Sequence, residues 1–161
     1  MGNFDKKLEK FWEIFYYNDG YIKVVTGLRN TLYISLAGLA IGIVIGTLIA
    51  IVEVFPKYKR LPKILDGFCR FYVGLFRGTP VVVQLLVTYY VVLPLMGINM
   101  PGLNVCVLVF GLNSGAYVSE IMRSGILSVD PGQMEAGRAV GLSYGVTMLK
   151  IVVPQAIKNI L

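Results

Sequence analysis

The sequence contains no histidine, only two cysteines and few charged residues, and each scarcity excludes a class of protein. Asp, Glu, Lys and Arg make up 15% of the 161 residues, whereas apolar residues make up 56% and the mean hydropathy is +0.70. These values lie well outside the range of an ordinary soluble domain, so the chain is an integral membrane protein. Cys69 lies in a basic connector and Cys106 in an apolar stretch, so the two thiols predict neither a disulfide framework nor a metal pair.

The missing residue types also argue against a membrane enzyme. Lipid-modifying transferases and intramembrane proteases need clustered acids, histidine ligands or an activated nucleophile inside the bundle. The nine acidic residues form no tight pair within an apolar stretch, and no Walker A loop or other phosphate cradle is present. We therefore expect no catalytic residue, metal or cofactor in this chain, and any ATP must be bound by a partner. The formal charge of +6 does not indicate nucleic-acid binding, because the basic residues lie between apolar stretches, where they set topology.

Three apolar stretches are expected to cross the membrane as helices, at residues 30–53, 81–99 and 103–120. The uncharged run of the first stretch, residues 30–52, rises about 34 Å as a helix, against a hydrocarbon core of about 30 Å. Ten Lys and Arg residues lie in the first connector and after the third stretch, against five before the first stretch. This excess places the amino terminus outside and the connector, with Lys57 and Lys59, in the cytoplasm. Residues 144–161 indicate the start of a further span, and we expect the last spans to be missing.

Within the first stretch, glycine recurs every fourth residue at Gly38, Gly42 and Gly46, and Ala50 continues the stripe. Such a stripe lets another helix approach closely, either within this bundle or from another subunit. Glu53 follows at the end of the stretch, where a carboxylate can reach water.

Residues 1–29 mix aromatic side chains with charged ones and predict an amphipathic helix in the membrane interface. Contact with an external partner is the alternative interpretation. The aromatic residues are Phe4, Phe11, Trp12, Phe15, Tyr16 and Tyr17.

A short polar helix is predicted over residues 130–141. Asp130 can cap it, Pro131 fits its first position, and Gln133 stands where a capping box places its partner. Gly141 suits a left-handed helix stop, and Ser143 can cap the helix that follows. The predicted helix is too short to span and lies on the cytoplasmic side, so we expect it to be gripped by a partner through Gln133, Glu135 and Arg138.

The spacing of this region resembles the cytoplasmic EAA loop of bacterial ATP-binding-cassette (ABC) importer permeases. Every spacing of the motif matches, with its positions at Glu135, Ala136, Gly137, Gly141, Ile151, Val153 and Pro154. Two positions depart from the usual form, Gly137 in place of the second alanine and Val153 in place of leucine, and both are mild changes. The resemblance implies that Glu135, Ala136, Gly137, Arg138 and Gly141 form the coupling helix, which docks in a cleft of the ATPase subunit.

A second signature is similar to the polar amino acid uptake branch of these permeases. It comprises Arg77, Gly78, Thr79 and Pro80, the Gln84 that follows, and residues 113–136. A local interpretation of the first four residues also stands: Thr79 caps a helix, Pro80 takes its first position, and Arg77 anchors at the lipid headgroups.

The resemblance implies an all-α, polytopic transmembrane bundle of the type I-like importer class, in the bacterial inner membrane. Its implied partners are ABC ATPase subunits, a second permease subunit, an external solute-binding protein, the lipid bilayer and an amino acid substrate. An importer of another small solute is the alternative, and a membrane enzyme or a structural membrane protein would not explain the spacing of the EAA loop.

Four polar residues near or within the apolar stretches are candidates for the translocation pathway: Gln84, Asn113, Ser114 and Glu120. Polar groups in such places need partners, so they either form hydrogen bonds between helices or line a path for a zwitterion. Glu120 and Arg123 are three residues apart on one helical face, and we expect them to pair with each other or with headgroups.

Overall fold

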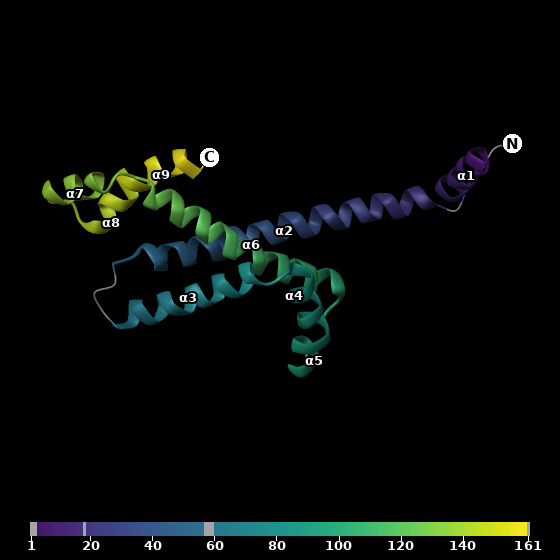
Figure 1. The fold of residues 1–161 in the computed structure, drawn as a ribbon, viewed down its shortest axis with the longest axis horizontal. Helices are drawn as coiled ribbons and strands as arrows, with labels where there is room; N and C mark the ends of the chain where they lie inside the picture. The colour runs from purple at the N-terminus through teal and green to yellow at the C-terminus, as the bar shows by residue number, and fades with distance from the viewer. Residues whose placement is uncertain (1–2, 18, 57–59, 161) are drawn as a thin grey trace.

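The computed structural model describes residues 3–17, 19–56 and 60–160, and the regular structure of these residues is entirely helical (Figure 1). The expected all-α fold is therefore confirmed. Lys57 and Lys59, which contribute to the charge excess of the first connector, lie outside the described residues.

The helices follow one another with short connections. The amino-terminal part contains α1 (Asn3–Trp12), the π-helical segment η1 (Glu13–Tyr17), α2 (Gly20–Val54) and α3 (Arg60–Gly78). The middle part contains α4 (Val81–Val87), the π-helical segment η2 (Thr88–Val92), α5 (Leu93–Leu95) and α6 (Gly102–Leu127). The carboxy-terminal part contains α7 (Pro131–Ala139), α8 (Tyr144–Thr147), the π-helical segment η3 (Met148–Val152) and α9 (Val153–Ile160).

Helices α2 and α6 are long and apolar enough to cross a membrane. Helix α2 has 35 residues and begins at Gly20, whereas its span was expected to begin at residue 30. Residues 20–29 contain no proline that would stop the helix, so the helical pattern extends towards the amino terminus. The amino-terminal segment expected over residues 1–29 accordingly ends before Gly20.

The stretch at 81–99, expected to be one spanning helix, is instead part of a bent helix pair. Helix α3 and the helical run Val81–Leu95 meet at 105°, and together they count as one broken span or a re-entrant loop. The run after the bend is too short to cross alone, since a span needs about 20 residues. Pro80 causes the break, because it donates no backbone N–H and disfavours helix in the residue before it. Most of the basic connector between the first two apolar stretches forms helix α3.

The closest helix packing joins α2 to α6, which lie across each other in Figure 1. A Cβ atom at Gly42 would lie 2.5 Å from Ser114 Cβ, and one at Gly46 would lie 2.7 Å from Val118 Cβ. Both helices contribute to this close approach through Gly38, Gly42 and Gly46 of α2 and Gly111 and Gly115 of α6. The glycine stripe thus packs inside this chain, which is one of the two alternatives that the sequence left open.

Two of the three apolar clusters among the described residues fix α3 and the carboxy-terminal helices around this crossing. Val73 of α3 packs with Ile49 of α2 and Ala116 of α6. At the other end of α6, a cluster of Val129, Val152 and Ala156 joins the turn before α7 to η3 and α9. Residues 144–160, expected to start a further span, pack against the end of α6, where Asn159 Nδ2 donates to Ser128 Oγ at 2.9 Å.

The crossing predicts opposite effects for the same substitution at two glycines of α2. Gly42→Ala should lower the free energy of unfolding by about 1–3 kcal/mol, because the added methyl group overpacks the contact with Ser114. Gly27→Ala is the matched control, since nothing lies within 4 Å of its Cβ position; it should raise stability by about 0.5–1 kcal/mol through helix propensity. Unfolding by SDS in detergent micelles measures both, and equal effects would contradict the close packing.

Candidate functional site

Helix α7 is closed at both ends by the groups that the sequence predicts. Asp130 Oδ1 accepts a hydrogen bond from the Gly132 N–H at 2.7 Å, and Pro131 occupies the first helical position. Gly141 has φ +88°, which confirms the left-handed stop. Ser143 Oγ accepts from the Val146 N–H at 3.4 Å and so caps α8 as predicted.

The carboxyl end of α7 forms a Schellman motif. The Gly141 N–H donates to the Arg138 carbonyl and the Leu142 N–H to the Gly137 carbonyl, both at 3.1 Å. Arg138 Nη1 also donates to the Leu142 carbonyl at 2.7 Å, so this side chain braces the turn. The predicted capping box is not formed, because Gln133 Oε1 instead accepts from Gln155 Nε2 of α9 at 3.1 Å.

One face of α7 packs against the helices behind it, and the other face is exposed. Met134 packs on the cluster of Val129, Val152 and Ala156. Gly137 is buried, whereas Glu135, Ala136 and Arg138 are exposed. The helix therefore presents these three residues outward.

Gly137 is a larger departure from the EAA pattern than the sequence suggested. An alanine Cβ at this position would overlap Thr147 Cγ2, and it would lie 3.2 Å from Ile151 Cδ1. Thr147 is completely buried, and its hydroxyl donates to the Ser143 carbonyl at 3.0 Å. The contact between Gly137 and Thr147 thus sets the distance between α7 and the α8–η3 run.

Tyr144 ties the same region to the first long helix, and sequence reasoning missed it. Its hydroxyl donates to the Val54 carbonyl at the end of α2 at 3.1 Å. Its ring packs edge to face on Phe55, with the ring centroids 6.0 Å apart. No pattern in the sequence signals this contact, because the hydrogen bond joins residues 90 positions apart.

Four charged side chains form a chain of ion pairs across α2, α3 and α6. Arg77 pairs with Glu120 at 3.1 Å, Glu120 with Arg123 at 3.3 Å, and Arg123 with Glu53 at 3.7 Å. The pairing of Glu120 with Arg123 was predicted. The expectation that Glu53 reaches water is wrong, because its side chain is 4% exposed. Alternating charge lets these groups compensate one another inside an apolar protein.

Arg77 faces protein groups rather than lipid headgroups alone. In addition to pairing with Glu120, its guanidinium carbon lies 5.5 Å from the centre of the Tyr117 ring, within the range of a cation–π contact. Thr79, expected to cap the next helix, instead donates its hydroxyl to the Leu75 carbonyl at 2.8 Å. Pro80 itself occupies the cap position of α4, so the local helix-start interpretation is shifted by one residue.

Gln84 and Asn113 meet at the bend between α3 and α4. Pro80 has no N–H to offer the carbonyl four residues earlier, that of Phe76. Gln84 Nε2 donates to this carbonyl at 2.9 Å and Asn113 Nδ2 at 3.2 Å. The two side chains also join each other, since Asn113 Nδ2 donates to Gln84 Oε1 at 3.2 Å. Hydrogen bonding between helices, one of the two predicted roles, is therefore observed.

The four pathway candidates do not form one site. Gln84 and Asn113 are together at the bend, where Gln84 also borders a groove of about 290 Å³ between α3 and α4. Ser114 is the next residue along α6 but lies against Gly42 of α2. Glu120 belongs to the chain of ion pairs.

Two membrane-length helices, together with a short helix that is capped at both ends and exposed on one face, define an integral membrane protein. The chain belongs to the family described as binding-protein-dependent transport system inner membrane component, whose model matches residues 42–161.

Relatives with described roles match most of this chain. It is 40% identical over 137 residues to the "Putative glutamine transport system permease protein GlnP" of Rickettsia prowazekii (strain Madrid E), covering 85% of this chain and 61% of that protein. It is 38% identical over 137 residues to the "Arginine transport system permease protein ArtQ" of Bacillus subtilis (strain 168), covering 85% of this chain and 60% of that protein. The chain thus spans about 60% of the length of these relatives.

A solved structure has the same arrangement of helices. The "Crystal structure of an amino acid ABC transporter with histidines" superposes with a TM-score of 0.70 at 35% identity. The match covers 86% of this chain and 65% of that chain.

The hydrogen bonds at the bend predict a loss of stability in Asn113→Leu. The substitution removes one donor to the Phe76 carbonyl and the partner of Gln84 Oε1, and it should lower the free energy of unfolding by about 1–3 kcal/mol. Asn104→Leu, at an exposed position on the same helix, is the control and should change stability by less than about 0.5 kcal/mol. If SDS unfolding finds both variants equal to the parent, the bonds at the bend contribute nothing.

The contact between α7 and α8 predicts a rescue. Gly137→Ala should destabilise the protein by about 1–3 kcal/mol, because the new methyl group overlaps Thr147 Cγ2. Adding Thr147→Ser removes that atom and keeps the hydroxyl, so the double variant should recover part of the loss. Gly145→Ala, whose Cβ position has nothing within 4 Å, is the control. The comparison uses thermal unfolding in detergent, and additive losses in the double variant would rule out the contact.

Proposed function

We propose that this chain is the permease subunit of an ATP-driven importer of polar amino acids in the bacterial inner membrane. The observation that carries the proposal is helix α7, which is capped at both ends and clamped behind by Gly137 and Met134. It leaves Glu135, Ala136 and Arg138 exposed on its outer face. A short, rigid helix with a free face suits insertion into a partner's groove.

In this proposal the chain has no ATPase site of its own, and two ABC ATPase subunits bind below a pair of permease subunits, through the α7 helix of each permease. Movement of α7 passes to η3 and α9 through Gly137 and Gln133, and to α2 through the hydrogen bond of Tyr144. Helices α2 and α6 follow together, because their glycines hold them in close contact. ATP can drive the cycle only if it binds differently to the inward-facing and outward-facing states.

The substrate class rests on the relatives, which are named for glutamine and arginine transport. We infer that an external solute-binding protein delivers a polar amino acid to a pathway formed with a second permease subunit. Glu120 and Arg77 are partly exposed acidic and basic side chains, suited to the two ends of a zwitterion. Gln84 and Asn113 use their amide donors within the fold, and Ser114 lies against Gly42 of α2. We therefore rank these three residues below Glu120 as candidates for the translocation pathway.

Uptake by the complete transporter tests the pathway. Proteoliposomes that hold the full-length permease, its ATPase and its binding protein are assayed with radiolabelled glutamine and arginine. Ala at Glu120 should lower uptake, and unchanged uptake by Gln84→Ala and Asn113→Ala would limit those residues to a role in folding.

The docking role of α7 predicts a defect in coupling without a defect in insertion. Glu135→Lys should weaken the ATPase contact by reversing an exposed charge. Gly141→Leu should re-aim the helix, because a side chain at φ +88° costs about 1–2 kcal/mol. Both variants should insert normally but lose co-purification with the ATPase, or else lose uptake while ATP hydrolysis stops responding to the loaded binding protein.

Lys63→Glu provides a matched charge reversal at an exposed site on α3 and should behave like the parent. If Glu135→Lys and Gly141→Leu also assemble and transport like the parent, α7 is only a connector and the importer proposal loses its main support.

A further inference from the structure

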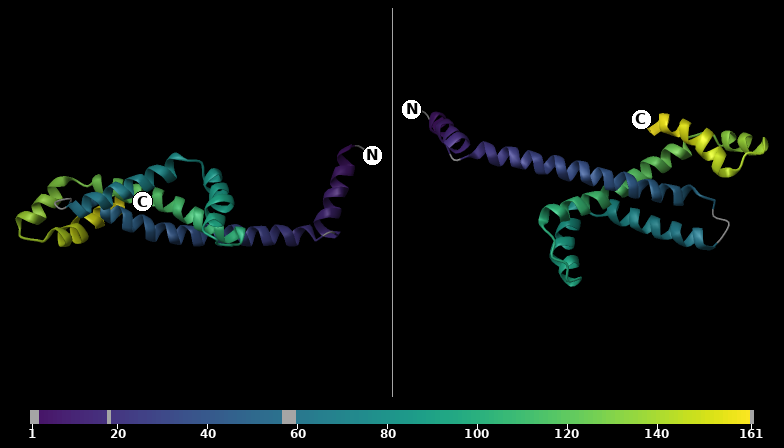
Figure 2. Two further views of the ribbon diagram at one scale, coloured as in Figure 1. Left: turned by 90° about the horizontal axis from the view of Figure 1, so that it is seen from below. Right: turned by 180° about the vertical axis from the view of Figure 1, so that it is seen from behind.

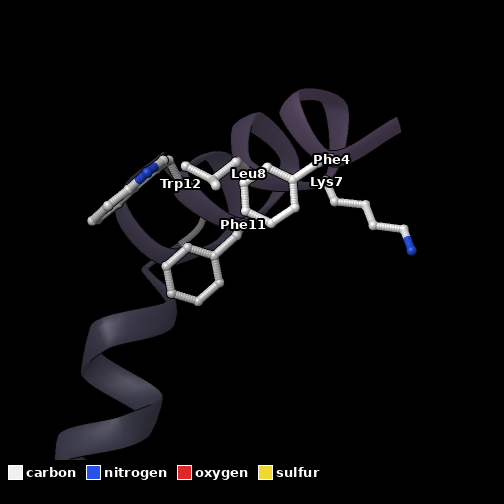
Figure 3. Close-up of a pocket in the computed structure, with 5 residues that line it drawn as sticks. All are labelled: Phe4, Lys7, Leu8, Phe11 and Trp12. Carbon is white, nitrogen blue, oxygen red and sulfur yellow. The ribbon is translucent and has the colours of Figure 1, made fainter. Parts of the chain in front are cut away.

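Helix α1 has one apolar face that no other part of the described chain covers. Four large side chains form this face together with the stem of Lys7, and they line a shallow hollow of about 460 Å³ (Figure 3). They are Phe4, Leu8, Phe11 and Trp12, which are between 42% and 72% exposed. Asp5, Lys6, Glu9 and Lys10 fall on the remaining circumference of the helix, so α1 is strongly amphipathic.

Contacts between η1 and the start of α2 fix the angle between α1 and α2. Asp19 has φ +54°, and a Cβ atom at Gly20 would lie 2.5 Å from the Ile14 carbonyl oxygen, so η1 packs directly on the start of α2. The rings of Phe15 and Tyr21 meet across this turn, with centroids 6.5 Å apart. Consequently α1 runs across the end of α2 instead of continuing it (Figures 1 and 2). An amphipathic helix in this position lies along the surface that α2 crosses.

The first turns of α2 indicate that the bilayer extends as far as α1. Their large apolar side chains are exposed, namely Tyr21, Ile22, Val24, Val25 and Leu28. The 35 residues of α2 rise about 52 Å, whereas the bilayer with its headgroups measures about 40–45 Å. A tilt of about 30–40°, within the range of spanning helices, brings both ends of α2 into the headgroup layers. The lipid-exposed surface of α2 then continues directly onto the apolar face of α1.

We propose that α1 is a membrane-surface anchor, which lies in the headgroup region of the leaflet where α2 begins and buries its apolar face among the acyl chains. Aromatic rings are favoured at this depth, and Phe11, Phe15, Trp12 and Tyr16 form a connected set of ring contacts. Three lysines and three acids balance the charge of residues 5–13. Apolar burial therefore drives the contact, so neutral lipids suffice and salt has little effect.

Trp12 is the only tryptophan in the sequence and lies on the proposed lipid face, so it reports on the anchor without a label. The full chain is reconstituted in phosphatidylcholine vesicles, and Trp12 emission is recorded with aqueous acrylamide and with phosphatidylcholines brominated near either end of the acyl chain. The proposal predicts blue-shifted emission, little loss with acrylamide and at high salt, and a larger loss with the shallow bromines than with the deep ones. A red-shifted emission that acrylamide quenches and bromolipids do not would overturn it.

A pair of glutamine substitutions separates membrane contact from mere proximity. Leu8→Gln places an amide on the apolar face and should increase quenching by acrylamide, whereas Lys10→Gln on the opposite face should leave Trp12 unchanged. Equal responses would contradict burial through this face. Protection of Trp12 that requires an added external protein would assign the face to that protein and reject the lipid anchor. The measurement involves no ATPase or substrate, so its result is independent of the transport proposal.

Discussion

The fold depends on the close approach of α2 and α6. Lipid is as apolar as leucine, so helices in a bilayer gain stability by packing backbones tightly rather than by escaping water. Glycines at 42 and 46 admit Ser114 and Val118 of α6, and Gly111 and Gly115 in turn admit Ile41 and Ile45 of α2. This reciprocal contact sets the position of α6, on which α3 packs from one side and the carboxy-terminal helices from the other.

Around this crossing, polar side chains replace the backbone bonds that the helix ends and the bend lose. At the bend, Gln84 and Asn113 donate hydrogen bonds to the Phe76 carbonyl, which Pro80 leaves without a backbone donor. At the end of α2, the Tyr144 hydroxyl donates a hydrogen bond to the Val54 carbonyl. In an apolar surrounding each unsatisfied carbonyl would be costly, so these side chains stabilise the breaks and also tie distant helices together. The bend between α3 and α4 and the end of α2 are therefore each held by specific hydrogen bonds to another helix.

Both local and long-range interactions position helix α7. Its caps at Asp130 and Gly141 are local and set where the helix begins and ends. Its distance from the helices behind it depends on Gly137 against Thr147, a contact with no local rule behind it. A helix held by its ends and one face can transmit a displacement without unfolding, which is the property that the proposed coupling role requires.

The sequence alone determined what depends on near neighbours: the helical class, the membrane setting, the caps of α7 and the pairing of Glu120 with Arg123. Those features follow from periodicity, composition and side chains within a few residues, for which spacing is sufficient. Tertiary structure decided the rest. The burial of Glu53, the bend that joins the expected second span to α3, and the bond from Tyr144 to α2 depend on which helices meet. The uncharged stretch from residue 81 has the same sequence pattern whether it crosses the bilayer as a separate helix or follows α3 after a bend, because packing against α6 fixes where it lies.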